Sequence, residues 1–422
     1  MRIVTDLHIH SKYSRATSRD ISIDNLHEGA KKKGINLLGT GDFTHPGWVA
    51  EIEKSLVEDG SGFLIHKTKD KSVRFILSSE ISAIYSKNGR VRKIHIVVLA
   101  SSIKDVKKIN RSLARIGNIT SDGRPILGID AEKLAKIIWD QSPEAIIIPA
   151  HIWTPWFSLF GSNSGFDTIE ECFGKYSDRI YAFETGLSSD PEMNWTVSQL
   201  DNLVVLSNSD AHSVKNLMRE ATVFEFKPSE FTYENFHKAL KEKDLSKIKY
   251  TIEFFPEEGK YHFDGHRACN VSMSPYDARK LNNICPECGK QMTLGVYHRI
   301  TDLADRKPGE KPEKTAGVKY IVPIAEILSQ IHGVGPQSKK IQEETNSIVG
   351  YFGSELGVLL DAPLEQIEKR AGIELKTAID KMRIGEVEKI PGFDGVFGQI
   401  KVPFKPKAEI IATSDLDQQK LF

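Results

Sequence analysis

Two histidines near the start of the sequence have the spacing of a metal-binding pair. His8 and His10 lie in the segment TDLHIHS at residues 5–11, which is typical of a β-strand. Residues i and i+2 of a strand project from the same face, so both imidazoles point the same way. Imidazole is the commonest metal ligand in proteins, and such a pair can hold one ion. Two exposed histidines on a strand would have the same spacing, so the pair alone does not establish a metal site.

Further side chains that bind metals follow the predicted strands up to residue 212. The carboxyl ends of the strands in a β/α barrel converge on one face, where active sites lie. His95 is the exception, because it lies inside its predicted strand and reaches that face only if it points inward. The candidate metal ligands are His8, His10, Asp42, Glu80, His95, His151, Glu184, Asp210 and His212. We expect all of them except Glu184 to be catalytic.

The ligand types of this set indicate a hydrolytic metal centre. Nitrogen and oxygen ligands without thiolate suit Zn, Mn, Fe or Mg, and more than four of them imply more than one ion. Adjacent divalent metals activate water and neutralise the attacking and leaving oxygens of a phosphate ester. The set therefore predicts a metal-dependent phosphoesterase with two or three ions.

The elements that must position these side chains alternate between strand and helix. The predicted strands are 2–6, 35–39, 74–78, 93–100, 145–149, 180–183, 203–206 and 221–226. The predicted helices among them are 24–33, with Ser22 or Asp24 as N-cap, 47–59, 102–115, 130–140 and 232–243. Such alternation favours a largely parallel sheet.

Composition excludes several classes of protein. The chain has 422 residues, of which 40% are hydrophobic and 27% charged, which suffices for two or three domains. Its formal net charge is zero, so nucleic acid would be bound through local patches. No apolar run approaches the ~20 residues of a membrane span, and no signal peptide is evident. Four cysteines in so long a chain are not a disulfide framework, and we expect a cytoplasmic protein.

A second candidate metal site lies beyond the predicted sheet. Cys285 and Cys288 form a Cys-x2-Cys knuckle, and Cys269 lies 16 residues upstream of it. This spacing is typical of a tetrahedral structural zinc site. His266 is our choice for the fourth ligand, with His262 and His298 as alternatives. The charged segment 299–319, which contains proline and glycine, is predicted to be a linker or an exposed loop.

Two further segments could contact nucleic acid. Gly333 and Gly335 lie between helical patterns and are followed by Lys339 and Lys340, so backbone N–H groups and a helix N-terminus could hold a phosphate. A plain inter-helix turn would have the same residues. Trp153 and Trp156 follow His151 and could flank an extruded base. They could equally pack at the rim of the sheet.

The motifs of the first 250 residues together resemble the polymerase-and-histidinol-phosphatase (PHP) superfamily. They are DLHIHS from Asp6, the turn at Asp42, Glu80, KIHIVVLA around His95, PAH ending at His151, and SDAH from Ser209 to His212. The resemblance implies a distorted (β/α)7 barrel with up to three metals. Two positions depart from the pattern. Asp42 precedes Phe43 where the superfamily usually has histidine, which makes His45 a possible replacement, and Ala16 stands where another ligand is expected.

Along almost the whole chain the sequence resembles the endonuclease Q family of DNA repair nucleases. The phrases GTGDFTHPGW, DGHRACNVSMSP, CPECGKQMTLGVYHRI and IPGFDGVFG carry this resemblance. It implies cleavage on the 5′ side of hypoxanthine, uracil, xanthine and abasic sites, with Zn, Mn or Mg in the barrel and one structural Zn. The implied parts are a PHP barrel at 1–252, a zinc module at 253–320, a helical DNA-binding domain at 321–405 and a tail at 406–422. A small-molecule phosphatase and a non-catalytic DNA-binding protein are the alternatives.

The last residues of the sequence resemble a shortened motif for binding the PCNA sliding clamp. Gln418 and the apolar pair Leu421 and Phe422 have the positions of the glutamine and the apolar plug of that motif. The usual second aromatic residue is absent, so a chance match is a rival explanation. A tether of this kind would raise the local concentration of a nuclease on DNA.

Overall fold

A computed structural model of the protein describes residues 1–405. Its centre is an eleven-stranded mixed sheet with a two-stranded sheet, β9–β10, beside it. The strands of the large sheet are β1 (Arg2–Asp6), β2 (Leu37–Gly39), β3 (Leu56–Glu58), β4 (Leu64–His66), β5 (Arg74–Lys87), β6 (Arg90–Ala100), β7 (Ile126–Leu127), β8 (Ile146–Pro149), β11 (Ala221–Glu225), β12 (Ile248–Glu253) and β15 (Gly317–Tyr320). The smaller sheet consists of β9 (Ala182–Glu184) and β10 (Val204–Leu206). The molecule is therefore a mixed α/β protein.

The expectation of a largely parallel sheet is wrong. β1, β2 and β5 are parallel neighbours, but β5 pairs antiparallel with β6, β6 with β8, and β11 with both β1 and β12. The cause at β5 and β6 is local. Asn88 and Gly89 both have positive φ, at 55° and 72°, and form a tight hairpin turn. The two strands therefore follow each other without a helix, which interrupts the strand–helix repetition.

The pair β9–β10 lies between β8 and β11. The N–H of Ile152, just after β8, donates to the carbonyl of Glu184 in β9 at 3.1 Å. On the other side, the N–H of Ser207, just after β10, donates to the hydroxyl of Thr222 in β11 at 2.9 Å. These bonds bring the ends of strands that are far apart in sequence to one common region. The candidate metal ligands converge there.

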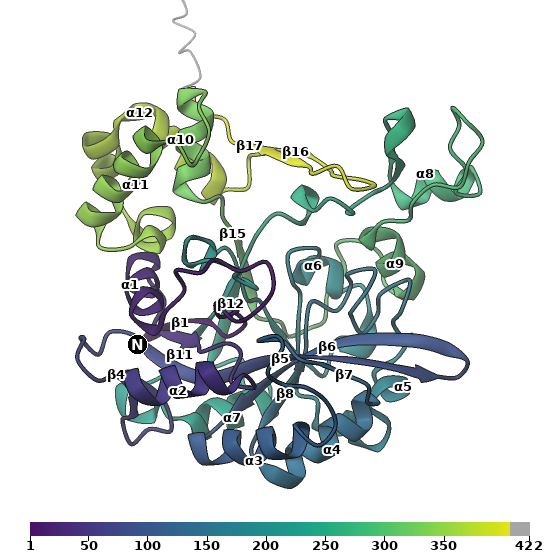
Figure 1. The fold of residues 1–422 in the computed structure, drawn as a ribbon. Coiled ribbons are helices and arrows are strands. Elements are labelled where there is room, and N and C mark those ends of the chain that lie inside the picture. Colours follow the sequence, from purple (N-terminus) through teal and green to yellow (C-terminus); the bar gives the residue numbers. More distant parts are fainter. Residues whose placement is uncertain (406–422) are drawn as a thin grey trace, which may run out of the picture.

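Helices cover the sheet, most of them on the lower side in Figure 1. They are α1 (Ile23–Lys33), α2 (Pro46–Ser55), α3 (Ile103–Leu113), α4 (Ala131–Gln141), α5 (Ile169–Phe173), α6 (Pro191–Asn194) and α7 (Tyr233–Lys241). The start of α1 agrees with the sequence, because Ser22 accepts a hydrogen bond from the N–H of Asn25. Gly34 ends α1 with a φ of 92°, as a left-handed C-cap. The predicted helix 47–59 is shorter, because its last residues form β3.

A small module follows β12 and lies at the upper right in Figure 1. Its elements are β13 (Asp264–His266), β14 (Val271–Met273), α8 (Pro275–Lys280) and α9 (Val296–Leu303).

Along the chain, short 3₁₀ helices cover Gly174–Arg179, Ser198–Leu200, Val214–Asn216, Pro228–Glu230, Pro256–Glu258 and Arg267–Cys269. Strand β12 itself was missed by the sequence prediction, which ended the sheet at residue 226.

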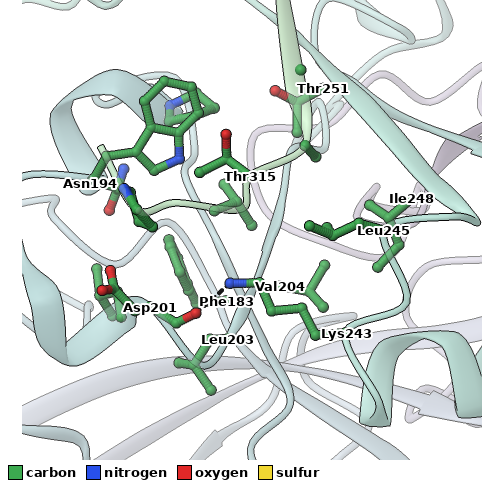
Figure 2. A pocket seen from close by; sticks show the side chains of 17 residues that line it. Phe183, Asn194, Asp201, Leu203, Val204, Lys243, Leu245, Ile248, Thr251 and Thr315 are labelled. Carbon is green, nitrogen blue, oxygen red and sulfur yellow. Dashed lines mark hydrogen bonds between the residues drawn. The ribbon is translucent and has the colours of Figure 1, made fainter. Parts of the chain in front are cut away.

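The predicted linker or exposed loop 299–319 is exposed over most of its middle, but both of its ends lie in regular elements. Its start lies in α9 and its end forms β15, which pairs with β12. Arg306 donates to Asp201 at 2.8 Å. Thr315 lines a cavity of about 30 Å³ beside β10, where Lys243 donates to the carbonyl of Asp201 (Figure 2). This cavity holds about one water molecule, so it is a packing gap and no substrate site.

The last described part is mainly helical. It contains α10 (Ile324–His332), α11 (Lys339–Phe352), a π-helical turn (Gly357–Asp361), α12 (Leu364–Arg383) and the strands β16 (Glu388–Ile390) and β17 (Gln399–Lys401). Gly372 interrupts α12 with a φ of 88°. Arg2 donates to Asp361 at 2.7 Å and so ties this part to β1. Among residues 1–405, no helix is long and apolar enough to cross a membrane.

Candidate metal centre

The first group of ligands comes from the loops after β1 and β10. The N–H of His10 donates to the carbonyl of Ala211 at 3.0 Å, which holds the two loops together. Nε2 of His10 lies 3.0 Å and Nε2 of His8 3.6 Å from Oδ1 of Asp210. These three buried atoms have no hydrogen-bond partner among the described residues. Because an unsatisfied buried polar atom is costly, their convergence fits a bound cation.

The second group consists of Glu80, His95 and His151. Oε1 of Glu80 lies 2.6 Å from Nδ1 of His95 and 3.2 Å from Nε2 of His151. Glu80 and His95 face each other from the antiparallel strands β5 and β6, so His95 does point inward as its candidacy required. The sequence placed Glu80 after its strand, but β5 continues through it to Lys87.

Glu80 joins the two groups. Its second oxygen, Oε2, lies 3.6 Å from Nε2 of His8 and 3.3 Å from Nε2 of His10. A carboxylate with one oxygen toward each group can bridge two adjacent metal ions. The site therefore has the ligand set of a divalent-metal centre.

Asp42 and Glu184, both predicted as ligands, instead support the histidines. Nδ1 of His10 lies 3.1 Å from Oδ1 of Asp42, and Nδ1 of His8 lies 3.0 Å from Oε2 of Glu184. A carboxylate on Nδ1 fixes the ring orientation and leaves Nε2 to the metal. In this structure Asp42 and Glu184 therefore orient the histidines and belong to neither ligand group, and their direct binding of metal stays a prediction.

Both supporting carboxylates accept several further hydrogen bonds. Oδ2 of Asp42 accepts from the N–H and hydroxyl of Ser11, each at 2.6 Å, and from the hydroxyl of Ser14 at 2.8 Å. Glu184 accepts from the side-chain amide of Asn208 at 3.0 Å and from the N–H of His151 at 2.9 Å. These hydrogen bonds hold both carboxylates in place beside the histidines that they orient.

Three site residues have left-handed backbones. Asp42, His151 and Asp210 have φ values of 45°, 31° and 46°, in loops that directly follow strands. Such values are uncommon outside glycine and occur where the surrounding structure enforces them, often at functional sites. The tight turns aim these side chains back over the ends of the strands.

The charges of the site are tuned by burial and by neighbours. Burial acts to lower the pKa of His8, but Glu184, Glu80 and Asp210 outweigh it and raise that pKa well above its usual value. Burial acts to raise the pKa of Glu80, but His95, His8 and Arg124 reverse this and hold it well below its usual value. Glu80 therefore stays ionised, as a ligand carboxylate must be.

Two other histidines near the site make different contacts. His212 lies at the rim, with its ring centroid 4.5 Å from that of His10 and Nδ1 2.8 Å from the carbonyl of Asp210, and it belongs to neither ligand group. His45 caps α2 by accepting from the N–H of Gly47, and it stacks on Tyr13. It therefore does not replace the missing superfamily histidine.

Arg124 and Asn208 were missed by sequence reasoning. Nη1 of Arg124 donates to Oε2 of Glu80 at 3.0 Å. Asn208 accepts from the N–H of Leu7 at 2.7 Å and donates to Glu184, so it connects the first strand to the support of His8. An isolated arginine or asparagine in a loop has no spacing pattern, so only the fold assigns these positions.

The predicted zinc ligands also come together. His266, Cys269, Cys285 and Cys288 place one ligand atom each within 4.8 Å of one another. Gly289 has a φ of 70° and lets the knuckle turn. The alternatives make other contacts: His298 pairs with Asp264 at 2.5 Å, and His262 stacks against Phe263 and Tyr297. This group of three thiols and one imidazole has the composition of a structural zinc site.

The two predicted aromatic contacts to DNA differ from each other. Trp153 is fully buried, and its indole N–H donates to Asn194 at 2.7 Å. It cannot reach a nucleotide, so its predicted role in DNA binding is wrong. Trp156 is 48% exposed and lines a cavity of about 570 Å³ together with Tyr261 and Phe397. Thr154 connects this cavity to the metal centre, because its hydroxyl contacts both His151 and the carbonyl of Trp156.

The predicted glycine hairpin joins two helices. Gly333 ends α10 in a left-handed conformation with a φ of 66°, and Ser338 precedes α11. Lys339 has an exposed side chain, and Lys340 contacts His332 at 3.1 Å. A side chain at Gly335 would meet no atom within 4 Å, so this turn is open to a partner.

Three comparisons place the chain among known proteins. The family model of the MJ0043 C-terminal domain matches residues 323–386. The chain is 31% identical over 416 residues to the uncharacterized protein YqxK of Bacillus subtilis, across 95% of this chain and 99% of that protein. It is 34% identical over 259 residues to the uncharacterized protein MJ0043 of Methanocaldococcus jannaschii, across 60% of this chain and 32% of that protein.

Two solved structures resemble it over their full length. The lesion-specific endonuclease PfuEndoQ of Pyrococcus furiosus has a TM-score of 0.85 and 32% identity, across 99% of this chain and 100% of that one. Endonuclease Q in complex with a 27-mer duplex that has an abasic lesion at the active site has a TM-score of 0.83 and 33% identity, across 97% and 100%. The ligand groups and this likeness agree: the chain belongs to the endonuclease Q family and is a metal-dependent nuclease.

Proposed function

We propose that this nuclease cleaves duplex DNA on the 5′ side of hypoxanthine, uracil, xanthine and abasic sites. The observation that carries the proposal is the position of Glu80 between two buried ligand groups. Such an arrangement suits a phosphodiester held across adjacent metals. The likeness to an endonuclease Q bound to a duplex with an abasic lesion supports damaged DNA as the substrate.

The residues of the centre have distinct roles in this proposal. His8, His10 and Asp210 form one metal site, and His95 and His151 form the other, with Glu80 shared. Two or three divalent ions, Zn, Mn or Mg, would supply an activated water and neutralise charge on the phosphate. Glu184 and Asp42 keep the Nδ1 protons on the histidines, so that Nε2 stays available.

The reaction is the hydrolysis of one phosphodiester bond. The oxygen of a water forms a bond to phosphorus, and the bond from phosphorus to the 3′-oxygen breaks. One proton of the water ends on the 3′-oxygen, which leaves a 3′-hydroxyl and a 5′-phosphate. His212 at the rim, 28% exposed on its side chain, is positioned to exchange protons with solvent.

The cavity beside Trp156 is the proposed place of the extruded nucleotide. It lies next to the loop of His151 and has the aromatic walls on which a base or a sugar can stack. Arg219 also lines it and is anchored by a hydrogen bond to the carbonyl of Ser209, beside Asp210. This connects the proposed lesion pocket directly to the first ligand group.

The other parts of the chain would hold the duplex. We propose a PHP barrel at 1–252, a module at 253–320 stabilised by zinc, and a helical DNA-binding domain at 321–405. In the last, the turn at Gly333 and Gly335 with Lys339 and Lys340 would contact phosphates. The proposed clamp-binding residues Gln418, Leu421 and Phe422 lie outside the described residues.

The decisive experiment is a panel of labelled duplexes with hypoxanthine, uracil, xanthine, an abasic site or no lesion, each with Zn, Mn or Mg. We expect a nick 5′ of the lesion and none in undamaged DNA. His8→Ala, Glu80→Ala and Asp210→Ala should abolish nicking and reduce the bound metal, whereas His237→Ala on α7 should not. Hydrolysis of small phosphomonoesters without any nicking would contradict the proposal and favour a small-molecule phosphatase.

A further inference from the structure

Arg124 contributes a positive charge at the centre of the site. Its Nη1 donates at 3.0 Å to Oε2 of Glu80, the same oxygen that lies 3.3 Å from Nε2 of His10 and 3.6 Å from Nε2 of His8. The guanidinium therefore lies within the reach of one phosphate group from both ligand groups. None of the metal-ligand candidates provides a fixed cation there.

The loop that carries Arg124 is fastened to the site by its backbone. The N–H of Gly123 donates to the carbonyl of Tyr13 at 3.0 Å, and its carbonyl accepts from the hydroxyl of Thr44 at 2.9 Å. A β-carbon at Gly123 would come within 2.2 Å of Oδ2 of Asp42, so only glycine fits. The loop of Arg124 is thus packed directly against Asp42, the carboxylate that orients His10.

Exposure separates Arg124 from the buried ligands. The side chains of His8, His10 and Glu80 are at most 1% exposed, whereas that of Arg124 is 26% exposed. Its guanidinium has five N–H groups, and the hydrogen bonds within the described part of the chain use one of them. The remaining donors form a planar fork, which matches the oxygens of a phosphate.

We propose that Arg124 is a substrate-binding residue that donates hydrogen bonds to a non-bridging oxygen of the scissile phosphate. The inference rests on the proposed nuclease function and adds a residue to it. Glu80 orients the guanidinium, and the 26% exposure of the Arg124 side chain leaves it accessible to a phosphate. Negative charge builds up on the non-bridging oxygens as water adds to phosphorus, so the contact strengthens along the reaction.

The test compares two duplexes that cannot be hydrolysed. Both have an abasic lesion and a methylene group in place of the scissile 3′-oxygen, and one also has a methyl group in place of a charged non-bridging oxygen. Binding to the metal-loaded wild type, Arg124→Gln, Arg124→Lys and the control Arg111→Gln is measured by fluorescence anisotropy. Arg111 lies exposed on α3 and serves as a matched change away from the site.

Arg124→Gln should bind the charged duplex about tenfold more weakly, as expected for a hydrogen bond to a charged group. It should bind the methylated duplex as tightly as the wild type does, because the contact is already absent. Nicking of a natural lesion duplex should fall about 100-fold, with a smaller loss for Arg124→Lys and none for Arg111→Gln.

Elemental analysis of the same preparations separates a contact to substrate from support of Glu80. Unchanged metal content in Arg124→Gln agrees with the proposal, and a parallel loss of metal overturns it. Equal weakening toward both duplexes also overturns it, because the effect would then not involve that oxygen. If the wild type nicks no lesion duplex, the proposed cleavage at lesions is refuted. The binding comparison uses duplexes that cannot be hydrolysed, so it tests the role of Arg124 separately from that cleavage.

Discussion

Glu184 and His8 form a buried pair in which Nδ1 of the imidazole lies 3.0 Å from Oε2 of the carboxylate. The two residues are 176 positions apart in sequence and come from the ends of β9 and β1. Because Glu184 holds Nδ1 of His8, Nε2 of the same ring points at Asp210 and Glu80, where it can bind a metal. Glu184 is thus a positioning residue, although its type and its place after a strand suggested a ligand.

Glu184→Gln tests this relationship. A glutamine keeps the shape but lacks the charge that holds the proton on Nδ1, so we expect metal affinity and nicking to fall about 10- to 100-fold. Metal titration followed by elemental analysis measures the affinity, and circular dichroism checks the fold. Glu192→Gln, an exposed carboxylate change on α6, is the control. Unaltered metal affinity in Glu184→Gln would show that the pair has no part in holding His8.

The ligand chemistry was predicted from sequence more completely than the shape of the sheet. The sequence indicated one group of candidate ligands, because each is a metal-binding residue type in or directly after a predicted strand. Among them, the structure brings together the side chains of His8, His10, Glu80, His151 and Asp210. The sequence could not separate a ligand from its support. Asp42 and Glu184 are carboxylates after strands like Asp210, and only their hydrogen bonds distinguish them.

Strand direction was the main failure in the fold. Asn88-Gly89 between two β-rich runs is a local hairpin signal, and it was available in the sequence. The strand–helix alternation in the rest of the chain instead led us to expect parallel strands in this region. Arg124 could not be found at all, because its role depends on the neighbouring Gly123, whose backbone bonds to Thr44 and Tyr13, 79 and 110 positions away.

The zinc module gives a second prediction. Zn–thiolate bonds contribute folding free energy directly, so Cys285→Ala should lower the melting temperature of the module and weaken DNA binding. Hydrolysis of a small phosphodiester at the metal centre should persist. Calorimetry, anisotropy and zinc content are the measurements. Cys172→Ala, a thiol buried in the core away from the module, should keep its zinc. A Cys285→Ala variant with full zinc content and unchanged melting would exclude a structural zinc site.

The hairpin between α10 and α11 gives a third prediction. Lys339→Glu combined with Lys340→Glu should weaken binding about equally to damaged and undamaged duplexes, because phosphate contacts carry no base information. The slope of log K against log salt concentration should decrease in magnitude by about 1 for each lost contact. Lys104→Glu with Lys107→Glu on α3 is the matched control. A loss limited to one lesion would mean that the hairpin reads the base.

A buried carboxyl pair near β10 gives a prediction on stability. Burial raises the pKa of Glu220 well above its usual value, and Glu253 and Glu184 raise it further. Both oxygens of Glu220 are buried without a hydrogen-bond partner among the described residues. The folded protein therefore holds a proton that the unfolded chain releases at a pKa of about 4.3. Stability from this group is present below that pH and declines as pH rises toward the folded pKa.

Glu220→Gln removes this titration and imitates the protonated acid. We expect its melting temperature to exceed that of the wild type at pH 9, with a difference that shrinks toward pH 5. Thermal unfolding across this range is the measurement. Glu225→Gln changes an exposed carboxylate at the end of β11, the strand that begins directly after Glu220, and it should leave the melting temperature unchanged at both pH 5 and pH 9. A constant offset between Glu220→Gln and the wild type at every pH would mean that Glu220 is ionised in the folded protein.

The last prediction concerns the sliding clamp and residues 418–422, which lie outside the described part of the chain. Gln418, Leu421 and Phe422 match the glutamine and the apolar plug of a clamp-binding motif. Since a tether raises local concentration without changing the active site, deletion of 418–422 should abolish clamp binding and clamp-stimulated nicking. Nicking without the clamp should stay the same, because none of the metal-site residues is removed. A pull-down with purified clamp and a nicking assay with and without it measure both effects, and Leu421→Ala with Phe422→Ala should reproduce the deletion. If the truncated protein still binds the clamp as tightly as the full chain, the contact lies elsewhere on the protein.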